Sequence, residues 1–259
     1  MAIMTKDEAK YFTDTEMQLY DITTMPLTYI LKSLFIKIRR KTWGKIGAKN
    51  DRIVWTVSGV SDVTDFPATF NVRNYWERNT IRSVLQEITQ KHHISSACEF
   101  GCGYGRIIMV LKEFADMVVG FEREEHFIKI AKSLLPDITF YKVESFDDIE
   151  SNYDGTFDLS MTNVFLQHLT DEKCQKTIEC IKKMTADGHV LLIEKTDEKE
   201  TTINQANENE FISRARTLNT YKRMMEPYKL IYITRRILEP TYPLKRNPCS
   251  LMLFKDDRA

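Results

Sequence analysis

A run of glycines between a short apolar segment and a helical pattern constrains the fold of this chain more than any other feature. Residues 96–100 (SACEF) have the composition of a buried strand, and residues 107–114 follow as a predicted helix. The segment between them, 101–105 (GCGYG), allows a tight turn and a close approach of backbone to a ligand. Free N–H groups where the helix starts would favour negative ligand groups. The pattern therefore predicts a strand, loop and helix that together bind a small molecule.

Strand and helix signals alternate after this loop, which is typical of an α/β fold with a mostly parallel sheet. Strands are predicted at 96–100, 117–121, 139–143, 157–163, 189–194, 228–237 and 250–254. Helices are predicted at 107–114, 125–135, 171–184 and 208–226. The polar stretch 195–209 predicts a surface crossover or a lid.

Composition excludes several classes of protein. The 259 residues carry 37 Lys and Arg against 37 Asp and Glu, so the net charge is zero, which argues against a general nucleic-acid binder. No apolar run reaches the roughly 18 residues that span a bilayer, and the first residues contain no apolar signal core. The five cysteines are odd in number and lack paired metal spacing, which predicts reduced thiols in a cytoplasmic protein without a metal.

The glycine motif distinguishes between classes of cofactor. Residues 99–106 read EFGCGYGR, and Arg106 stands where the dinucleotide fingerprint G-x-G-x-x-G has its third glycine. A second acid, Glu122, closes the next predicted strand, where a carboxylate can accept both ribose hydroxyls. Together with 144–146 and 163–168 after the next two strands, this set resembles class I S-adenosylmethionine (SAM)-dependent methyltransferases. The resemblance covers roughly residues 75–255. The glycine spacing and Glu122 disfavour another nucleotide-binding fold.

The resemblance implies an enzyme, a transferase with a Rossmann-like fold. We expect a doubly wound, seven-stranded, mostly parallel sheet with an antiparallel last strand, preceded by an N-terminal helical cap. Residues 1–74 would form the cap, and residues 75–259 the methyltransferase core, with a lid at 195–225 as one interpretation. The cofactor would be SAM and the product S-adenosylhomocysteine (SAH).

The resemblance also implies a cofactor site. In the family the glycine loop passes under the methionine part of SAM, and the acid before it, here Glu99, helps to orient the ammonium group. An aromatic or basic residue of the helix before the core would cover the cofactor, although Tyr75 and Trp76 could equally pack that helix on the sheet. The expected cofactor-binding residues are Glu99, Gly101, Cys102, Gly103, Gly105, Glu122, Arg123, Glu144, Ser145, Phe146, Asn163, Tyr75, Trp76 and Arg78.

Three residues are candidates for the chemical step: His168, Glu194 and Tyr75. His168 follows the fourth strand, and an imidazole titrates near neutral pH, so it could act as a general base. A helix cap or a surface histidine is the alternative interpretation. Glu194 ends the fifth strand, and we expect it at the mouth of the pocket.

The methyl acceptor is narrowed mainly by exclusion. After the fourth strand the chain reads TNVF, without the prolines of the methyltransferases that act on amino groups of nucleic acids. The same segment lacks the clustered carboxylates of metal-dependent, catechol-type enzymes. We therefore expect a small-molecule acceptor with an oxygen or nitrogen nucleophile, bound in part by Gln167 and Arg214. The basic residues Arg214, Arg216 and Lys222 would suit an anionic acceptor, or simply form a solvated face.

Residues 27–41 predict an amphipathic helix with several basic side chains. Such a helix could lie on an anionic membrane, where the acceptor would be a lipid-linked or cell-surface glycan. More often such a helix covers an active site or forms a dimer contact, so the membrane is not favoured, and a monomer and a homodimer both remain open. A third alternative is a non-catalytic subunit with a SAM fold, which the intact glycine motif disfavours.

Overall fold

The computed structural model describes residues 48–49, 52–53, 67–144, 153, 155–185, 187–197, 202–204, 213–235 and 249–256. The predicted helix at 27–41 lies outside them. Residues Ser145 and Phe146, two of the expected cofactor-binding residues, also lie outside the described part of the chain.

The main sheet follows the order β10-β11-β7-β6-β3-β4-β5. Its strands are β3 (Ile94–Phe100), β4 (Ala115–Glu122), β5 (Thr139–Lys142), β6 (Leu159–Asn163), β7 (His189–Asp197), β10 (Lys229–Arg235) and β11 (Cys249–Lys255). Strands β3 to β7 pair in parallel, whereas β11 is antiparallel to both β7 and β10. The predicted doubly wound sheet with an antiparallel last strand is confirmed.

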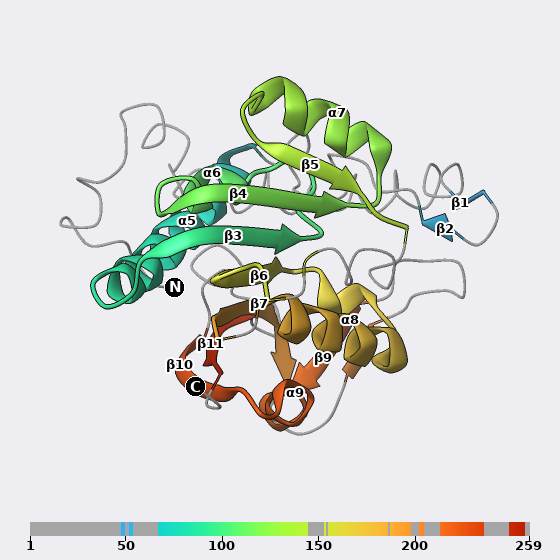
Figure 1. The fold of residues 1–259 in the computed structure, drawn as a ribbon. Coiled ribbons are helices and arrows are strands. Elements are labelled where there is room, and N and C mark those ends of the chain that lie inside the picture. The colour runs from blue at the N-terminus through green and yellow to red at the C-terminus, as the bar shows by residue number, and fades with distance from the viewer. Residues whose placement is uncertain are drawn as a thin grey trace, which may run out of the picture.

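Helices cover both faces of the sheet (Figure 1). One face packs against α5 (Pro67–Thr89), α6 (Ile108–Leu111) and α7 (Glu125–Leu134). The other face packs against α8 (Asp171–Met184) and α9 (Leu218–Met225). Strands covered on both faces are apolar almost throughout, as in Leu191–Ile193, all fully buried. The boundary expected between residues 74 and 75 lies inside α5.

The segment after β7 differs from the sequence-based expectation. A helix was expected over 208–226, but residues 213–217 form β9 (Ser213–Thr217), and α9 begins only after it. Strand β9 pairs in parallel with the end of β7 and antiparallel with β8 (Thr202–Asn204). Long-range pairing with β7 therefore decides the conformation here. A separate pair, β1 (Ala48–Lys49) and β2 (Arg52–Ile53), is antiparallel.

The order of the strands locates the functional edge. Strand β3 lies between β4 and β6, so the crossover from β3 leads one way along the sheet and later connections lead the other way. Ligands of doubly wound sheets bind outside the carboxyl ends of the strands where the order reverses. The loops that follow β3, β4 and β6 meet at this edge.

Candidate functional site

The glycine loop after β3 is folded back over the end of β4. The Gly101 and Cys102 N–H groups both donate to the Phe121 carbonyl, at 2.8 and 3.2 Å. The Gly105 N–H group donates to the Cys102 carbonyl at 3.0 Å, and the Gly103 N–H group donates to the Glu122 carboxylate at 2.8 Å. The turn therefore uses these four N–H groups within the protein. They precede the start of the helix, where free N–H groups stay a prediction.

Two of the loop glycines are required for different reasons. Gly101 has φ +70°, and a Cβ atom there would lie 2.5 Å from Cδ2 of Phe165. Gly103 has φ +56°, and a Cβ atom there would meet nothing within 4 Å. Both backbone conformations favour glycine. Gly101 also admits the Phe165 ring, whereas Gly103 borders open space that a ligand can enter.

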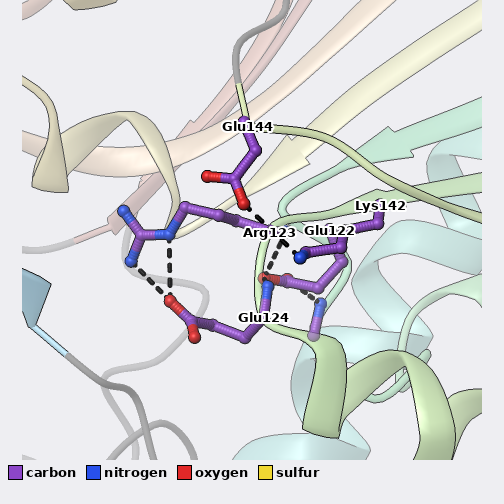
Figure 2. Close-up of polar contacts among 6 residues, drawn as sticks. Glu122, Arg123, Glu124, Lys142 and Glu144 are labelled. Carbon is purple, nitrogen blue, oxygen red and sulfur yellow. Dashed lines mark hydrogen bonds and ion pairs between the residues drawn. The ribbon is translucent and has the colours of Figure 1, made fainter.

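Glu122 ends β4 and holds the backbone around it (Figure 2). Besides the bond from Gly103 to Oε2, its Oε1 accepts from the N–H groups of Arg123 and Glu124, at 2.8 and 2.9 Å. Each carboxylate oxygen can accept about two hydrogen bonds, so Oε2 retains capacity for a hydroxyl group. The predicted ribose acid is therefore at the expected strand end, and it also fixes the turn.

The neighbours of Glu122 form surface ion pairs (Figure 2). The Arg123 guanidinium donates to Glu124 Oε1 through Nε and NH2, at 2.9 and 2.7 Å. Lys142 Nζ lies 3.4 Å from Glu144 Oε1, and both side chains are about half exposed. Exposed pairs of this kind contribute little to stability. Arg123 and Glu144 thus flank the acid as members of these ion pairs.

The Glu99 carboxylate is buried and only partly compensated. It is 2% exposed, and its Oε2 has no hydrogen-bond partner. Burial raises the pKa of Glu99 well above its ordinary range, and the nearby Arg106 guanidinium opposes that shift only in part. An unpartnered buried oxygen is costly unless a ligand completes it. A cationic ligand group is the partner that this carboxylate lacks.

Two charged residues beside Glu99 were not singled out from the sequence. Arg106 NH1 lies 2.6 Å from Glu77 Oε2, and Glu77, on α5, is buried. Burial lowers the pKa of Arg106, but the Glu77 carboxylate outweighs that effect and leaves the pKa above its ordinary value. The charge pattern of α5 did not reveal this pair, because the contact joins two elements that are distant along the chain.

The other residues expected on α5 are only partly described. For Tyr75 and Trp76 the structure describes the helix but not the side chains. The Arg78 Nε atom is buried without a partner. Burial, and then the charge of Arg82, lower the pKa of Arg78. The predicted roles of Tyr75, Trp76 and Arg78 toward the cofactor stay predictions.

Strand β6 ends at Asn163, and the segment after it carries Val164 and the short 3-10 helix η5 (Leu166–His168). The Gln167 amide Nε2 lies 2.8 Å from Nε2 of His168, which is half-buried. Two side-chain carbonyl oxygens here, Asn163 Oδ1 and Gln167 Oε1, are buried without a partner. The structure thus brings Asn163, Gln167 and His168 together on one segment at the functional edge.

Glu194 does not lie at the mouth of a pocket, as we expected from its place at the end of a strand. Its side chain is fully buried beneath η5, and both oxygens accept hydrogen bonds from the segment after β6. Burial raises the pKa of Glu194, and the hydrogen bonds counteract that rise. A carboxylate occupied in this way is not available as a base.

The three basic residues expected near the acceptor lie in different environments. Arg216 is fully buried and bonded to protein groups, so it is not part of a basic surface. Lys222 is exposed on α9. Arg214, on β9, is half-buried, and its NH1 atom is buried without a partner. Of these residues, Arg214 therefore has a buried donor that a ligand could satisfy.

Two further properties concern only the described part of the chain. Within it, no three His, Cys, Asp or Glu side chains are grouped closely enough to hold a metal ion. No helix in the same residues is long and apolar enough to cross a membrane. All five cysteines are buried and free.

Comparisons with known proteins agree with this fold. A family model described as "Methyltransferase domain" matches residues 91–239. A search of curated proteins gave no match. Among solved structures, a SAM-dependent methyltransferase from Leishmania major is 21% identical, with a TM-score of 0.59 over 79% of each chain.

Two archaeal structures are also similar in fold. A SAM-dependent methyltransferase from Methanosarcina mazei is 14% identical, with a TM-score of 0.52 over 64% of this chain and 93% of its own. One from Archaeoglobus fulgidus is 14% identical, with a TM-score of 0.51 over 69% of this chain and 94% of its own. These identities are low, so the structures are evidence for the fold alone.

Proposed function

Because the chain belongs to the methyltransferase-domain family, we propose that it transfers the methyl group of SAM to a nitrogen or oxygen of a small-molecule acceptor. SAM-dependent methyl transfer is the activity of this family, with SAH as the product. The acceptor and the roles of single residues are our proposal. A cytoplasmic location belongs to the same proposal and is supported by the five free cysteines.

One observation carries the proposal: Glu99 and Glu122 place carboxylate oxygens with unused hydrogen-bonding capacity beside the glycine loop. Glu99 Oε2 is unpartnered, and Glu122 Oε2 has capacity left. Four of the loop N–H groups are used within the protein, those of Gly101, Cys102, Gly103 and Gly105. A phosphate would need the opposite arrangement. An ammonium group and ribose hydroxyls fit it, and the methionine and ribose parts of SAM carry these groups.

The residues present therefore fit SAM. Glu99 would pair with its ammonium group, Glu122 would accept from its ribose, and Gly103 would allow close passage of the methionine chain. Arg106 could balance the cofactor carboxylate while it remains paired with Glu77. SAM supplies an already activated methyl group, so the protein has mainly to align the acceptor and remove a proton.

The unpartnered oxygens after β6 favour nitrogen over oxygen as the nucleophile. Asn163 Oδ1 and Gln167 Oε1 are both acceptors, and an amine brings more N–H donors than a hydroxyl group brings O–H donors. His168 would take up the proton that the nucleophile loses. Arg214 would bind an anionic group of the same acceptor through NH1.

Two measurements test the proposal. Calorimetry with SAH should show binding to the purified protein, and mass spectrometry should detect a methylated product when SAM is offered with a panel of matched amines and alcohols. Binding without any product across the panel, and without a methylated ligand after expression, would favour a non-catalytic subunit. Products from alcohols alone would contradict the preference for nitrogen.

Once an acceptor is known, His168→Ala tests the base. The kcat should fall about 10²- to 10⁴-fold while SAH affinity changes little, because general-base catalysis typically contributes that much. His93 is the control, because its side chain is 70% exposed and it precedes β3, at the end of that strand away from the glycine loop. His93→Ala should leave kcat unchanged. An unaltered kcat in His168→Ala would assign His168 to the fold of η5.

A further inference from the structure

Arg216 connects β9 to the segment between β6 and α8. Its Nε donates to Asp171 Oδ1 at 2.9 Å, its NH1 to the Leu166 carbonyl at 2.9 Å, and its NH2 to the Leu169 carbonyl at 2.7 Å. The Arg216 side chain is fully buried. A planar guanidinium with several fixed donors specifies the relative positions of these three acceptors, which a lysine could not do.

Glu194 binds the same segment through its N–H groups. Its Oε1 accepts from the backbone N–H groups of Phe165 at 3.0 Å and Leu166 at 2.9 Å, and from the Thr162 hydroxyl at 2.9 Å. Its Oε2 accepts from the Gln167 N–H group at 3.1 Å. The carboxylate therefore satisfies the first N–H groups of η5, which have no partner within so short a helix.

The two charged side chains act on one short stretch of backbone. Leu166 donates its N–H group to Glu194 and offers its carbonyl to Arg216. The strands that carry the two residues are adjacent, since Thr196 of β7 pairs with Arg216 of β9. Removing Glu194 would leave three backbone N–H groups without their acceptor, and removing Arg216 would leave two backbone carbonyls without their donor, which is costly for buried groups.

This arrangement reaches the proposed active site in two directions. The Phe165 ring packs where a Cβ atom of Gly101 would otherwise lie, so the segment contacts the glycine loop. Gln167 and His168 follow directly on η5. We propose that Glu194 and Arg216 are positioning residues that hold 165–169 against the glycine loop and thereby set both cofactor affinity and the place of His168. This inference rests on the proposed function, because SAH is the probe that tests it.

The experiment compares Glu194→Gln, Arg216→Lys and the double variant by calorimetry with SAH. We expect at least about fivefold weaker SAH binding in each single variant, since each loses hydrogen bonds to a charged group. The double variant should be weaker by less than the product of the two changes, because both residues act on Leu166. Glu87→Gln and Arg223→Lys, both on exposed side chains, are matched controls and should bind SAH as the wild type does.

To distinguish positioning of the active site from a purely structural role, SAH affinity is measured at a temperature where every variant is folded. Lower thermal stability with unchanged SAH affinity in both folded variants would overturn the proposal. If a variant does not fold, amide hydrogen exchange of the wild type is measured instead. Slow exchange of the amides of Phe165, Leu166 and Gln167 supports the proposal that Glu194 and Arg216 hold this segment. Exchange as fast as in an unstructured peptide overturns it. A wild type that binds no SAH would refute the proposed function. Hydrogen exchange alone would then test whether Glu194 and Arg216 hold residues 165–169.

Discussion

The glycine loop 101–105 and the segment 164–169 lie at the same edge of the sheet, but their polar groups are satisfied differently. In the glycine loop the backbone N–H groups are used locally, while the adjoining acid Glu99 keeps an unpartnered buried oxygen. In the second segment, two charged side chains from β7 and β9 hold the backbone through N–H and carbonyl groups. The first region therefore retains an acidic oxygen for a cation. In the second region the protein fixes the backbone, and the Gln167 side chain keeps an unpartnered amide oxygen.

The two regions differ in where backbone strain and buried, unpartnered groups are tolerated. An unpartnered buried carboxylate and positive-φ backbone both cost free energy, and they persist where the surrounding structure enforces them. The second region has one such residue, Val164 at φ 56°, beside the hydrogen bonds to Glu194. Substitutions in each region test whether the glycine loop mainly binds the ligand and the segment 164–169 mainly provides a rigid backbone.

The largest effect is expected from Gly103→Val. The φ of +56° strains a β-branched residue, and the valine side chain would enter the space that the ligand needs. Calorimetry should detect no SAH binding, while far-ultraviolet circular dichroism stays close to that of the wild type. Unchanged affinity would show that the open side of the loop faces away from the cofactor.

Gly101→Ala should act on stability rather than first on binding. Both glycines have positive φ, but only at Gly101 would the new Cβ meet the Phe165 ring, at 2.5 Å. We expect the free energy of unfolding to fall by about 1–3 kcal/mol more than in Gly103→Ala, as for other overpacked sites. Denaturant titration of the two alanine variants measures the difference. Adding Phe165→Leu to Gly101→Ala should recover part of the lost stability. No recovery would show that overlap with the Phe165 ring is not the cause of the loss.

Glu122→Ala should weaken both the fold of the loop and the cofactor. Three backbone N–H groups lose their acceptor, and the ribose hydroxyls lose theirs. A loss of about 1.5–3 kcal/mol in SAH binding is typical for hydrogen bonds to a charged group. Glu125→Ala changes an exposed acid close by on α7 and is the control. Equal SAH affinity in the two variants would assign Glu122 to the turn alone.

The smallest effect is a proton linkage at Glu99. Burial holds the pKa of Glu99 well above its ordinary value, and an ammonium group beside its free oxygen would lower that pKa. The complex would then bind fewer protons than the free protein, so SAH affinity should rise with pH until the free carboxyl group is ionised. Calorimetry in two buffers of different ionisation enthalpy measures the released protons.

Glu99→Gln is the matching variant for that linkage. It should abolish the proton release and weaken SAH about tenfold, in line with the loss of a charged hydrogen bond. The same raised pKa affects folding stability in the opposite direction. Folded Glu99 holds its proton more tightly than the unfolded chain does, so the stability of the wild type falls as the pH rises above the pKa of Glu in the unfolded chain. Between about pH 4 and about pH 7, the Glu99→Gln variant should therefore lose less stability than the wild type.

The sequence was sufficient where a local pattern and a local cap agree. The predicted helix at 171–184 coincides with α8, whose start is capped by the Thr170 hydroxyl accepting from the Lys173 N–H group at 3.3 Å. Apolar periodicity and the first-turn acids supply the same information before any tertiary contact forms. The strand, glycine loop and acid of the cofactor edge were predicted for the same reason, because each signal lies within a few residues.

Tertiary structure decided what depends on pairing between distant segments. The sequence 213–217 has no strong strand preference and becomes β9 because the end of β7 offers it hydrogen bonds. The functions of Glu194 and Arg216 follow from partners 28 and 50 residues away at Leu166. A charged residue at a strand end looks the same in the sequence whether it faces a ligand or backbone. Only the packing of β7, β9 and η5 determines which of these it meets, because burial makes each charge bind the nearest groups that can satisfy it.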